Sequence, residues 1–193
     1  MPEPTTPRPA ATLILLRRGG KHRERGVEVL MLRRSEEARF MPGVWVFPGG
    51  TVEADEDERT CAIRELAEEA SIELGEDAEL FPWSRWITPE MVPLRFDTHF
   101  FVALAPPHSP PEPDGAEVTE AAWLGPRAAL DSHDAGELSL VFPTIKHLES
   151  LLPYASAEEV LAAAGDRPIE PVLHRVVGEG EARRVVLPGE PGY

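Results

Sequence analysis

The chain has 193 residues, of which 42% are hydrophobic and 27% are charged, a balance typical of one globular domain with a sizeable core. Its 34 acidic and 19 basic side chains give a formal charge of −15, which argues against nucleic acid and anionic membranes as partners. The single cysteine, Cys61, excludes an internal disulfide and fits a cytoplasmic protein. The longest apolar run near the start covers residues 13–16, far short of a membrane span.

The first part of the chain predicts an arm followed by strands. Residues 1–9 contain four prolines and predict a flexible arm. The apolar segments 10–17 and 27–33 predict two strands joined by a polar hairpin loop, and residues 44–47 predict a third short strand. The Pro-Gly-Gly sequence directly after this third strand should prevent it from continuing.

The clearest helix covers about residues 57–73. Apolar residues recur there at intervals of three and four, which indicates one buried face, and acidic residues stand at the positive N-terminal end. Phe81, Trp83 and Trp86 are expected to pack in the core rather than to stack on a base. Shorter patterns predict strands at 96–104, 118–124, 172–177 and 184–187, and helices at 143–152 and 157–164.

Three carboxylates converge on the 57–73 helix. Glu65, Glu68 and Glu69 stand three and four positions apart, so they lie on one face over about one turn. Like charges at this spacing destabilise an isolated helix by roughly 0.2–0.5 kcal/mol per pair. Mg²⁺ or Mn²⁺ would reverse that effect, because both prefer oxygen ligands. A solvated acidic face is the common alternative, and the surrounding residues must decide between the two.

Residues 50–72 resemble the Nudix box, G-x5-E-x7-R-E-U-x-E-E-x-G-U, in which U is a bulky apolar residue. The matching residues are Gly50, Glu56, Arg64, Glu65, Leu66, Glu68, Glu69 and Ile72. The one departure is Ser71, which stands where the family has Gly and concerns the exit of the helix rather than a ligand. By this resemblance the chain is identified as a member of the Nudix hydrolase superfamily.

The resemblance implies a reaction and a site. Arg64 would orient a carboxylate through a charge-assisted pair, and Glu56 would brace the loop against the helix. A metal-activated water would attack one phosphorus of a diphosphate, with Glu65 and Glu69 as the candidates for the base that accepts its proton. The ligands of Mg²⁺ or Mn²⁺ would be the carbonyl of Gly49 and the carboxylates of Glu65, Glu68 and Glu69.

The same resemblance implies the fold, the Nudix α/β/α sandwich with a mixed β-sheet and a C-terminal extension. Residues 10–164 would form the hydrolase domain. Residues 165–193 would form the extension, packed on the domain or on a dimer mate. No spacing in the sequence shows a homodimer, so that question stays open at this point.

A distal acid often completes such sites shortly before a tryptophan. The candidates ahead of Trp123 are Glu117 and Glu120. Glu117 is preferred as a further metal ligand, because several relatives place their acid about six residues before the aromatic residue. The alternative for both residues is a surface glutamate at the start of a strand.

Residues 30–50 are similar to a second signature, which is found in the coenzyme-A-cleaving branch of the family: L-L-T-x-R-[SA]-x3-R-x3-G-x3-F-P-G-G. The agreeing residues are Leu30, Arg34, Ser35, Arg39, Gly43, Phe47, Pro48, Gly49 and Gly50. Arg34 and Arg39 would then hold substrate phosphates, a task suited to the fixed guanidinium fork. Ion pairs with the nearby Glu36 and Glu37 are the alternative.

The sequence therefore predicts an enzyme that cleaves the diphosphate bond of a small nucleoside-diphosphate-linked substrate, with coenzyme A or an acyl-coenzyme A preferred. Another Nudix substrate is one alternative: ADP-ribose, a dinucleoside polyphosphate or an oxidised nucleoside triphosphate. A non-catalytic sensor of a nucleotide metabolite is a second. The complete set of Glu65, Glu68 and Glu69 argues against the sensor, which need not retain every ligand.

Overall fold

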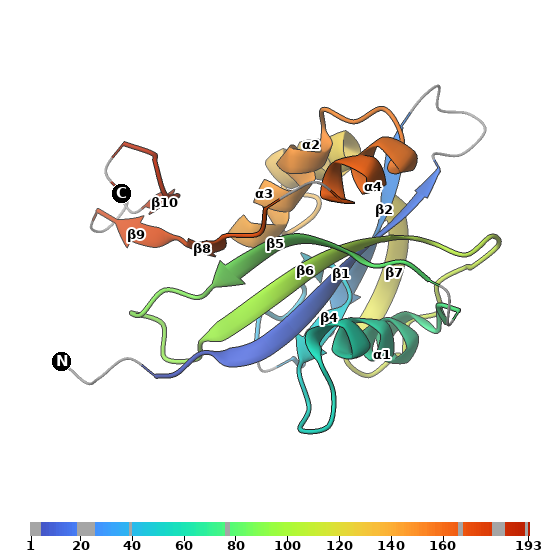
Figure 1. The fold of residues 1–193 in the computed structure, drawn as a ribbon, viewed down its shortest axis with the longest axis horizontal. Helices are drawn as coiled ribbons and strands as arrows, with labels where there is room; N and C mark the ends of the chain where they lie inside the picture. The colour runs from blue at the N-terminus through green and yellow to red at the C-terminus, as the bar shows by residue number, and fades with distance from the viewer. Residues whose placement is uncertain are drawn as a thin grey trace.

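The structure is a computed structural model and describes residues 5–18, 26–38, 40–75, 78–165, 168–178, 184–191 and 193. Within them, a mixed sheet lies between one helix and a group of three (Figure 1). The strands are β1 (Arg8–Arg18), β2 (Val27–Arg34), β3 (Trp45–Val46), β4 (Gly49–Thr51), β5 (Phe81–Ile87), β6 (Phe96–Leu104), β7 (Val118–Leu124), β8 (Pro171–Leu173), β9 (Arg175–Val177) and β10 (Arg184–Val186). The helices are α1 (Glu58–Ala70), α2 (Pro126–Asp134), α3 (Phe142–Leu151) and α4 (Ala157–Gly165).

The main sheet runs in the order β3-β2-β1-β6-β5-β8, while β4 pairs with β1 and β7 pairs with β2. The β1–β6 and β5–β8 pairs are parallel, and the other pairs in this sheet are antiparallel. The parallel pairing of β1 with β6 extends from Arg8↔Phe96 to Leu16↔Leu104. The predicted α/β/α sandwich with a mixed sheet is confirmed.

The apolar run in β1 reflects burial on both faces of the sheet. Leu13 and Leu15 pack on the α1 side, whereas Ile14 and Leu16 pack on the side of α2, α3 and α4. All four side chains are fully buried. A strand that is covered on both faces needs apolar residues at every position, so it loses the alternation of a half-exposed strand.

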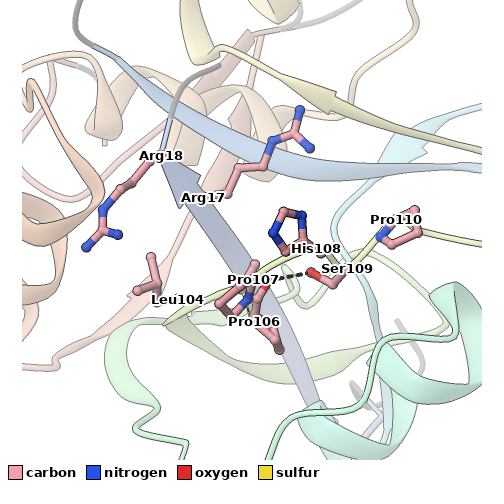
Figure 2. A pocket seen from close by; sticks show the side chains of 9 residues that line it. Arg17, Arg18, Leu104, Pro106, Pro107, His108, Ser109 and Pro110 are labelled. Atoms are coloured by element: carbon pink, nitrogen blue, oxygen red, sulfur yellow. Dashed lines mark hydrogen bonds between the residues drawn. The ribbon is translucent and has the colours of Figure 1, made fainter. Parts of the chain in front are cut away.

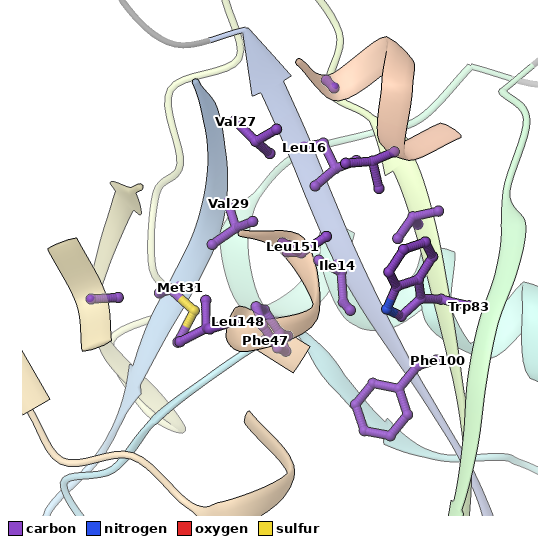
Figure 3. Packing of buried hydrophobic residues seen from close by; sticks show 14 of the residues in the cluster. Ile14, Leu16, Val27, Val29, Met31, Phe47, Trp83, Phe100, Leu148 and Leu151 are labelled. Carbon is purple, nitrogen blue, oxygen red and sulfur yellow. The ribbon is translucent and has the colours of Figure 1, made fainter. Parts of the chain in front are cut away.

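The core on the side of α2, α3 and α4 contains the aromatic rings of Phe47, Trp83 and Phe100 (Figure 3). The imidazole of His147 is buried beside them. The ring of His147 stacks on Phe100, with 4.0 Å between their centroids. Nδ1 of His147 lies 2.6 Å from the carbonyl oxygen of Pro143, which can only accept, so Nδ1 carries the proton. Nε2 of the ring lies within hydrogen-bond distance of the hydroxyl oxygen of Ser84, at 2.6 Å. Both ring nitrogens are thereby paired inside the apolar core.

Helix α1 has a defined beginning and end. Asp57 caps its N-terminus, because the Asp57 carboxylate accepts a hydrogen bond from the N–H of Thr60 at 2.8 Å. Ser71 ends the helix in the left-handed region, with φ 54° and ψ 31°, and its N–H bonds to the carbonyl of Ala67. The helix therefore ends at Ala70, three residues before the predicted end, and its C-cap Ser71 stands where the Nudix box has Gly.

Two strands differ from the sequence prediction. β3 ends at Val46 and the backbone bends at Pro48, as the Pro-Gly-Gly sequence predicts, but the residues that follow form β4, which was not predicted. They can pair with β1 because Gly49 approaches it closely: a Cβ there would lie 2.5 Å from the carbonyl oxygen of Ala11. The aromatic segment forms β5, which was not predicted as a strand. An irregularity between Pro82 and Ser84 places both Trp83 and Trp86 in the core, so the period of two is hidden.

Helix α2 was also missed. It begins at Pro126, and proline is favourable at the first position of a helix. Its buried residues are Pro126, Ala129 and Leu130, too few to form a clear apolar stripe in the sequence.

The C-terminal segment contributes a strand to the main sheet. β8 pairs in parallel with β5 from Arg85↔Pro171 to Ile87↔Leu173, so this part of the predicted extension joins the domain. The predicted strand 172–177 is split at His174 into β8 and β9, and β9 pairs with β10 in a separate sheet. At the other end of the chain, β1 already begins at Arg8, inside the predicted arm. No helix in the described ranges is long and apolar enough to cross a bilayer.

Candidate active site

The chain bends at Pro48, and the two glycines that follow and begin β4, here called the Gly49-Gly50 bend, lie directly against α1. Glu69 is only 4% exposed, and its carboxylate accepts a hydrogen bond from the N–H of Gly49 at 3.0 Å. A Cβ on Gly50 would lie 2.1 Å from Oε1 of Glu65, so a side chain at this position would displace that carboxylate. The two glycines therefore allow two carboxylates of one helix to lie against a backbone bend.

Arg64 connects the loop before α1 to the helix. Its Nη2 and Nε form a two-point pair with Glu56 at 2.7 and 3.1 Å. Its Nη1 also bonds to Glu65 at 3.0 Å and to Glu68 at 2.8 Å. A further hydrogen bond of 3.3 Å joins Nη2 to the carbonyl oxygen of Thr51, next to the bend. One guanidinium thus orients three carboxylates.

The carboxylates of the site differ strongly in their affinity for protons. The hydrogen bond from Arg64 lowers the pKa of Glu56 to about 2. Burial raises the pKa of Glu69 to about 8, although the hydrogen bond from Gly49 opposes this shift. Burial also raises the pKa of Glu65, with the charge and hydrogen bond of Arg64 opposing it. Two carboxylates are therefore held where their charge is unfavourable without a cation.

The predicted metal-binding glutamates differ in their exposure to solvent. The side chains of Glu68 and Glu65 are 59% and 15% exposed, while Glu69 is buried. As placed in the described part of the chain, no three carboxylate, imidazole or thiolate groups stand close enough to enclose a metal ion. Arg64 holds Glu65 and Glu68, and the bend holds Glu69. Carboxylate oxygens beside a backbone bend are nevertheless the donor set that a hard divalent cation prefers.

The two candidates for the distal acid have different surroundings. Glu120 is opposite Arg33 in the β2–β7 pair and forms an ion pair with it. Glu117 is exposed, but its negative charge contributes to the raised pKa of both Glu65 and Glu69. Of the two, Glu117 is therefore the one that faces the α1 site.

Asp114 positions Glu117 and was missed in the sequence. Its carboxylate accepts hydrogen bonds from the N–H groups of Ala116, Glu117 and Val118, the last at 2.8 Å. Burial raises the pKa of Asp114, but these three donors outweigh it and lower the pKa. The Asp-Gly pair at residues 114–115, a typical turn sequence, was the available signal.

Of the two arginines predicted to bind phosphate, the structure describes the surroundings of only one. Arg34 ends β2 on the α1 side, where its positive charge opposes the rise in the pKa of Glu69, and its Nε donates to the carbonyl oxygen of Phe40 at 3.0 Å. Arg39 lies outside the described residues. The alternative pairing with Glu36 involves Arg33 instead, at 2.7 Å.

Cys61 lies on the buried side of α1, as expected for a residue that fills the core. It is fully buried, and burial raises the pKa of its thiol to about 12. The thiol is therefore neutral at ordinary pH and is not a nucleophile.

Two clefts lie away from this site. One, with a volume of about 700 Å³, is at the far end of β1 between Arg17, Arg18 and the proline-rich segment 106–110 (Figure 2). The other, of about 460 Å³, is on the opposite face of the sheet and includes Arg33, Trp45 and Glu120. Neither contains Glu65 or Glu69.

The comparisons with known proteins agree with this geometry. Residues 6–142 match the family profile of the NUDIX domain, a range that includes all the site residues discussed above. The chain therefore belongs to the Nudix family. Its relatives and structural neighbours include proteins named as hydrolases.

Three curated relatives illustrate the range of names. The chain is 29% identical over 162 residues to "Putative nudix hydrolase 7" of Caenorhabditis elegans, covering 64% of this chain and 55% of that protein. It is 22% identical over 244 residues to the acyl-coenzyme A diphosphatase NUDT19 of Xenopus laevis, covering 74% and 64%. It is 31% identical over 100 residues to the NAD-capped RNA hydrolase NudC of Pseudomonas aeruginosa, covering 52% and 32%. The chain thus spans less than two thirds of each relative.

Among solved structures, a NUDIX hydrolase from Alicyclobacillus acidocaldarius matches with a TM-score of 0.72 and 28% identity, covering 85% of this chain and 99% of that one. The NUDIX domain of NrtR from Shewanella oneidensis, crystallised with ADP ribose, matches with a TM-score of 0.57 and 19% identity, covering 81% and 90%. At that identity the second match shows the fold alone.

Proposed function

We propose that this protein is a Nudix hydrolase that uses a divalent cation to cleave the diphosphate bond of a nucleoside-diphosphate-linked substrate, with coenzyme A or an acyl-coenzyme A as the first candidate. The observation that carries the proposal is the placement of the Glu65 and Glu69 carboxylates against the Gly49-Gly50 bend. Burying two carboxylates is unfavourable unless positive charge joins them. The site is therefore arranged to receive a cation.

The chemistry of the donors supports Mg²⁺ or Mn²⁺. The ligands would be the carbonyl oxygen of Gly49 and the carboxylates of Glu65, Glu68, Glu69 and, as the distal acid, Glu117. A bound cation would act as a Lewis acid toward the diphosphate and would lower the pKa of the attacking water.

Side chains of the protein would position the carboxylates and accept the proton of the attacking water. Arg64 and Glu56 hold the carboxylates in place, and Asp114 holds Glu117. Glu65 and Glu69 are both candidates for the general base, because a raised pKa brings a carboxylate closer to the working pH. The kcat–pH profiles of Glu65→Gln and Glu69→Gln distinguish them: the variant that loses the acidic limb of the profile has lost the base.

The substrate assignment rests on Arg34 and on the named relatives. Acyl-coenzyme A diphosphatases are among the relatives that match, as are hydrolases of mRNA caps and of NAD-capped RNA. Arg34 places a positive charge near Glu69, where it can bind a phosphate of the substrate. The same role for Arg39, the homodimer and the cytoplasmic location stay predictions.

A substrate panel with Mg²⁺ titration tests the proposal. We expect purified protein to convert coenzyme A into 4′-phosphopantetheine and adenosine 3′,5′-bisphosphate, identified by mass. The panel also contains ADP-ribose, a dinucleoside polyphosphate, an oxidised nucleoside triphosphate and NAD. Cleavage of one of these but not of coenzyme A would end the coenzyme A assignment and keep the reaction class. Binding without turnover in Mg²⁺ or Mn²⁺ would favour the nucleotide-metabolite sensor.

A further inference from the structure

A cleft opens where β1 and β6 part, away from the Gly49-Gly50 bend. The two strands pair as far as Leu16↔Leu104, and the N–H of Ala105 still bonds to the carbonyl oxygen of Leu16 at 2.7 Å. Beyond this point a cleft of about 700 Å³ lies between the end of β1 and the proline-rich segment 106–110 (Figure 2). Such a volume is typical of small-molecule sites. We call it the far-end cleft.

The far-end cleft is lined by basic side chains. Arg17 and Arg18 come from the end of β1, and His108 comes from the segment opposite. Figure 2 shows His108 on the same side of β1 as Arg17. The chain has 34 acidic residues against 19 basic ones, yet none of the described residues that line this cleft is acidic. The lining therefore favours an anionic ligand.

Arg17 is held in place next to a donor that lacks an acceptor. Its guanidinium lies over the ring of Trp123, with Cζ 4.5 Å from the ring centroid. Its Nε pairs with Glu28 at 2.8 Å, so the two Nη nitrogens remain as donors for a ligand. The Nε1 of Trp123 is buried and has no hydrogen-bond partner in the described part of the chain, which is unfavourable. The surroundings of Arg17 therefore suit a ligand that brings acceptors.

The opposite wall of the far-end cleft is apolar and preformed. It consists of three proline rings and the side chain of Leu104, which is 37% exposed. The hydroxyl of Ser109 donates to the carbonyl oxygen of Pro106 at 2.8 Å, and His108 is held at φ 58°, in the left-handed region. Non-glycine residues in that region store strain and are often found at binding sites. Because proline fixes the backbone, a ligand that packs here loses little affinity to ordering of the wall, and proline-rich segments pack well on aromatic rings.

We propose that the far-end cleft is a second ligand site, which binds a small aromatic carboxylate or phosphate. The anionic group bonds to Arg17 beside His108, and the aromatic ring packs on the prolines and Leu104. Arg17 lies six residues further along β1 than Ala11, next to the Gly49-Gly50 bend, which corresponds to roughly 20 Å. The cleft is therefore separate from the α1 site, and the inference does not depend on the proposed function.

Calorimetric titration with matched probes tests the inference. 1-Naphthoate and 1-naphthyl phosphate contain both parts of the ligand, 1-naphthylmethanol contains only the ring, and inorganic phosphate contains only the anion. We expect at least one of the two complete probes to bind at least roughly tenfold more tightly than either partial probe. Which of the two binds distinguishes a carboxylate from a phosphate ligand. NMR spectra of the amide groups should place the shifts at residues 104–110, and the same shifts should appear in Glu69→Gln.

Variants of the lining test the contacts. Arg17→Gln should raise the Kd of the bound probe roughly tenfold or more, since a hydrogen bond to a charged group corresponds to such a factor. His108→Gly should also weaken binding, and its fold should persist because φ 58° suits glycine. Arg127→Gln is the matched control: Arg127 is exposed on α2, on the opposite face of the sheet, so the Kd should stay unchanged.

Three outcomes would overturn the inference: neither complete probe binds, the neutral probe binds as tightly as both, or the shifts are confined to the α1 site. Circular dichroism checks the fold of each variant. If Arg17→Gln does not fold, Arg17→Lys keeps a positive charge opposite Glu28 but lacks the planar fork of donors. A Kd that is unchanged in both Arg17→Lys and His108→Gly then rejects the site.

Discussion

The two faces of the sheet are covered by different kinds of side chain. On the α1 side, β4 and α1 bury the carboxylates of Glu65 and Glu69, whose pKa values burial raises. On the side of α2, α3 and α4, the core consists of apolar and aromatic side chains, and the polar ring of His147 is paired at both nitrogens. The α1 face therefore holds carboxylate charge that Arg64 and Arg34 offset only in part, whereas the opposite face supplies stability.

Glu69→Gln should have the largest effect on activity. We expect kcat to fall about 10³-fold, because the amide neither accepts a proton nor attracts a cation as a carboxylate does. The fold should persist, since the amide oxygen can still accept from the N–H of Gly49. Steady-state kinetics with Mg²⁺ measures the effect. Glu73→Gln, at an exposed position beyond the helix, is the control and should keep its activity. Unchanged activity of Glu69→Gln would remove Glu69 from the site.

On the opposite face, Leu148→Ala should act on stability rather than on catalysis. Leu148 is fully buried on α3, and truncation there should lower the free energy of unfolding by about 3 kcal/mol. Urea denaturation measures this loss, and kcat of the folded variant should change little. The partly buried Ile145→Ala on the same helix should lose less. A large drop in kcat with stability retained would contradict the division between the faces.

The stabilisation of the fold by Mg²⁺ should depend on pH through Glu69. The pKa of Glu69 rises from 4.5 to about 8 in the folded protein, so its contribution to stability is fully present below pH 4.5 and is lost as the pH rises through about 8. A cation offsets that loss. The increase in Tm that Mg²⁺ produces relative to EDTA should therefore be larger at about pH 8.5 than at pH 6, by roughly 3 °C or more. Glu69→Gln should show a smaller difference between the two pH values, and an equal difference would exclude Glu69 as the cause.

The smallest expected effect concerns the exit of α1. Ser71 adopts φ 54°, in the left-handed region that favours glycine. Ser71→Gly should raise the free energy of unfolding by about 0.5–1 kcal/mol, measured by urea denaturation. Ser71→Ala is the control, because alanine carries the same backbone strain and should bring no gain. Equal stabilities of the glycine and alanine variants would show that the strain is negligible.

Some features depended on the tertiary structure because they involve pairs that are distant in the sequence. β5 was missed because its irregularity sends both Trp83 and Trp86 into the core, and only the pairing with β6 reveals a strand. The choice between Glu117 and Glu120 required the β2–β7 register, which places Glu120 opposite Arg33. The hydrogen bond from Gly49 to Glu69 joins residues 20 positions apart, so no periodic pattern in the sequence predicts it.

The features that could be predicted from the sequence are those formed by residues close together in the chain. The continuous segment 50–72 carries both the acidic helix and the motif that identifies the family. The acidic face could be predicted because a helical face is defined by residues three and four positions apart. The apolar patterns likewise predicted β1, β2, β6 and β7. Only the assembled fold shows which carboxylates are buried and which groups surround each candidate for the distal acid. Burial and strand register are properties of the assembled sheet, and they fix the charge state of a carboxylate only once its neighbours from other elements are in place.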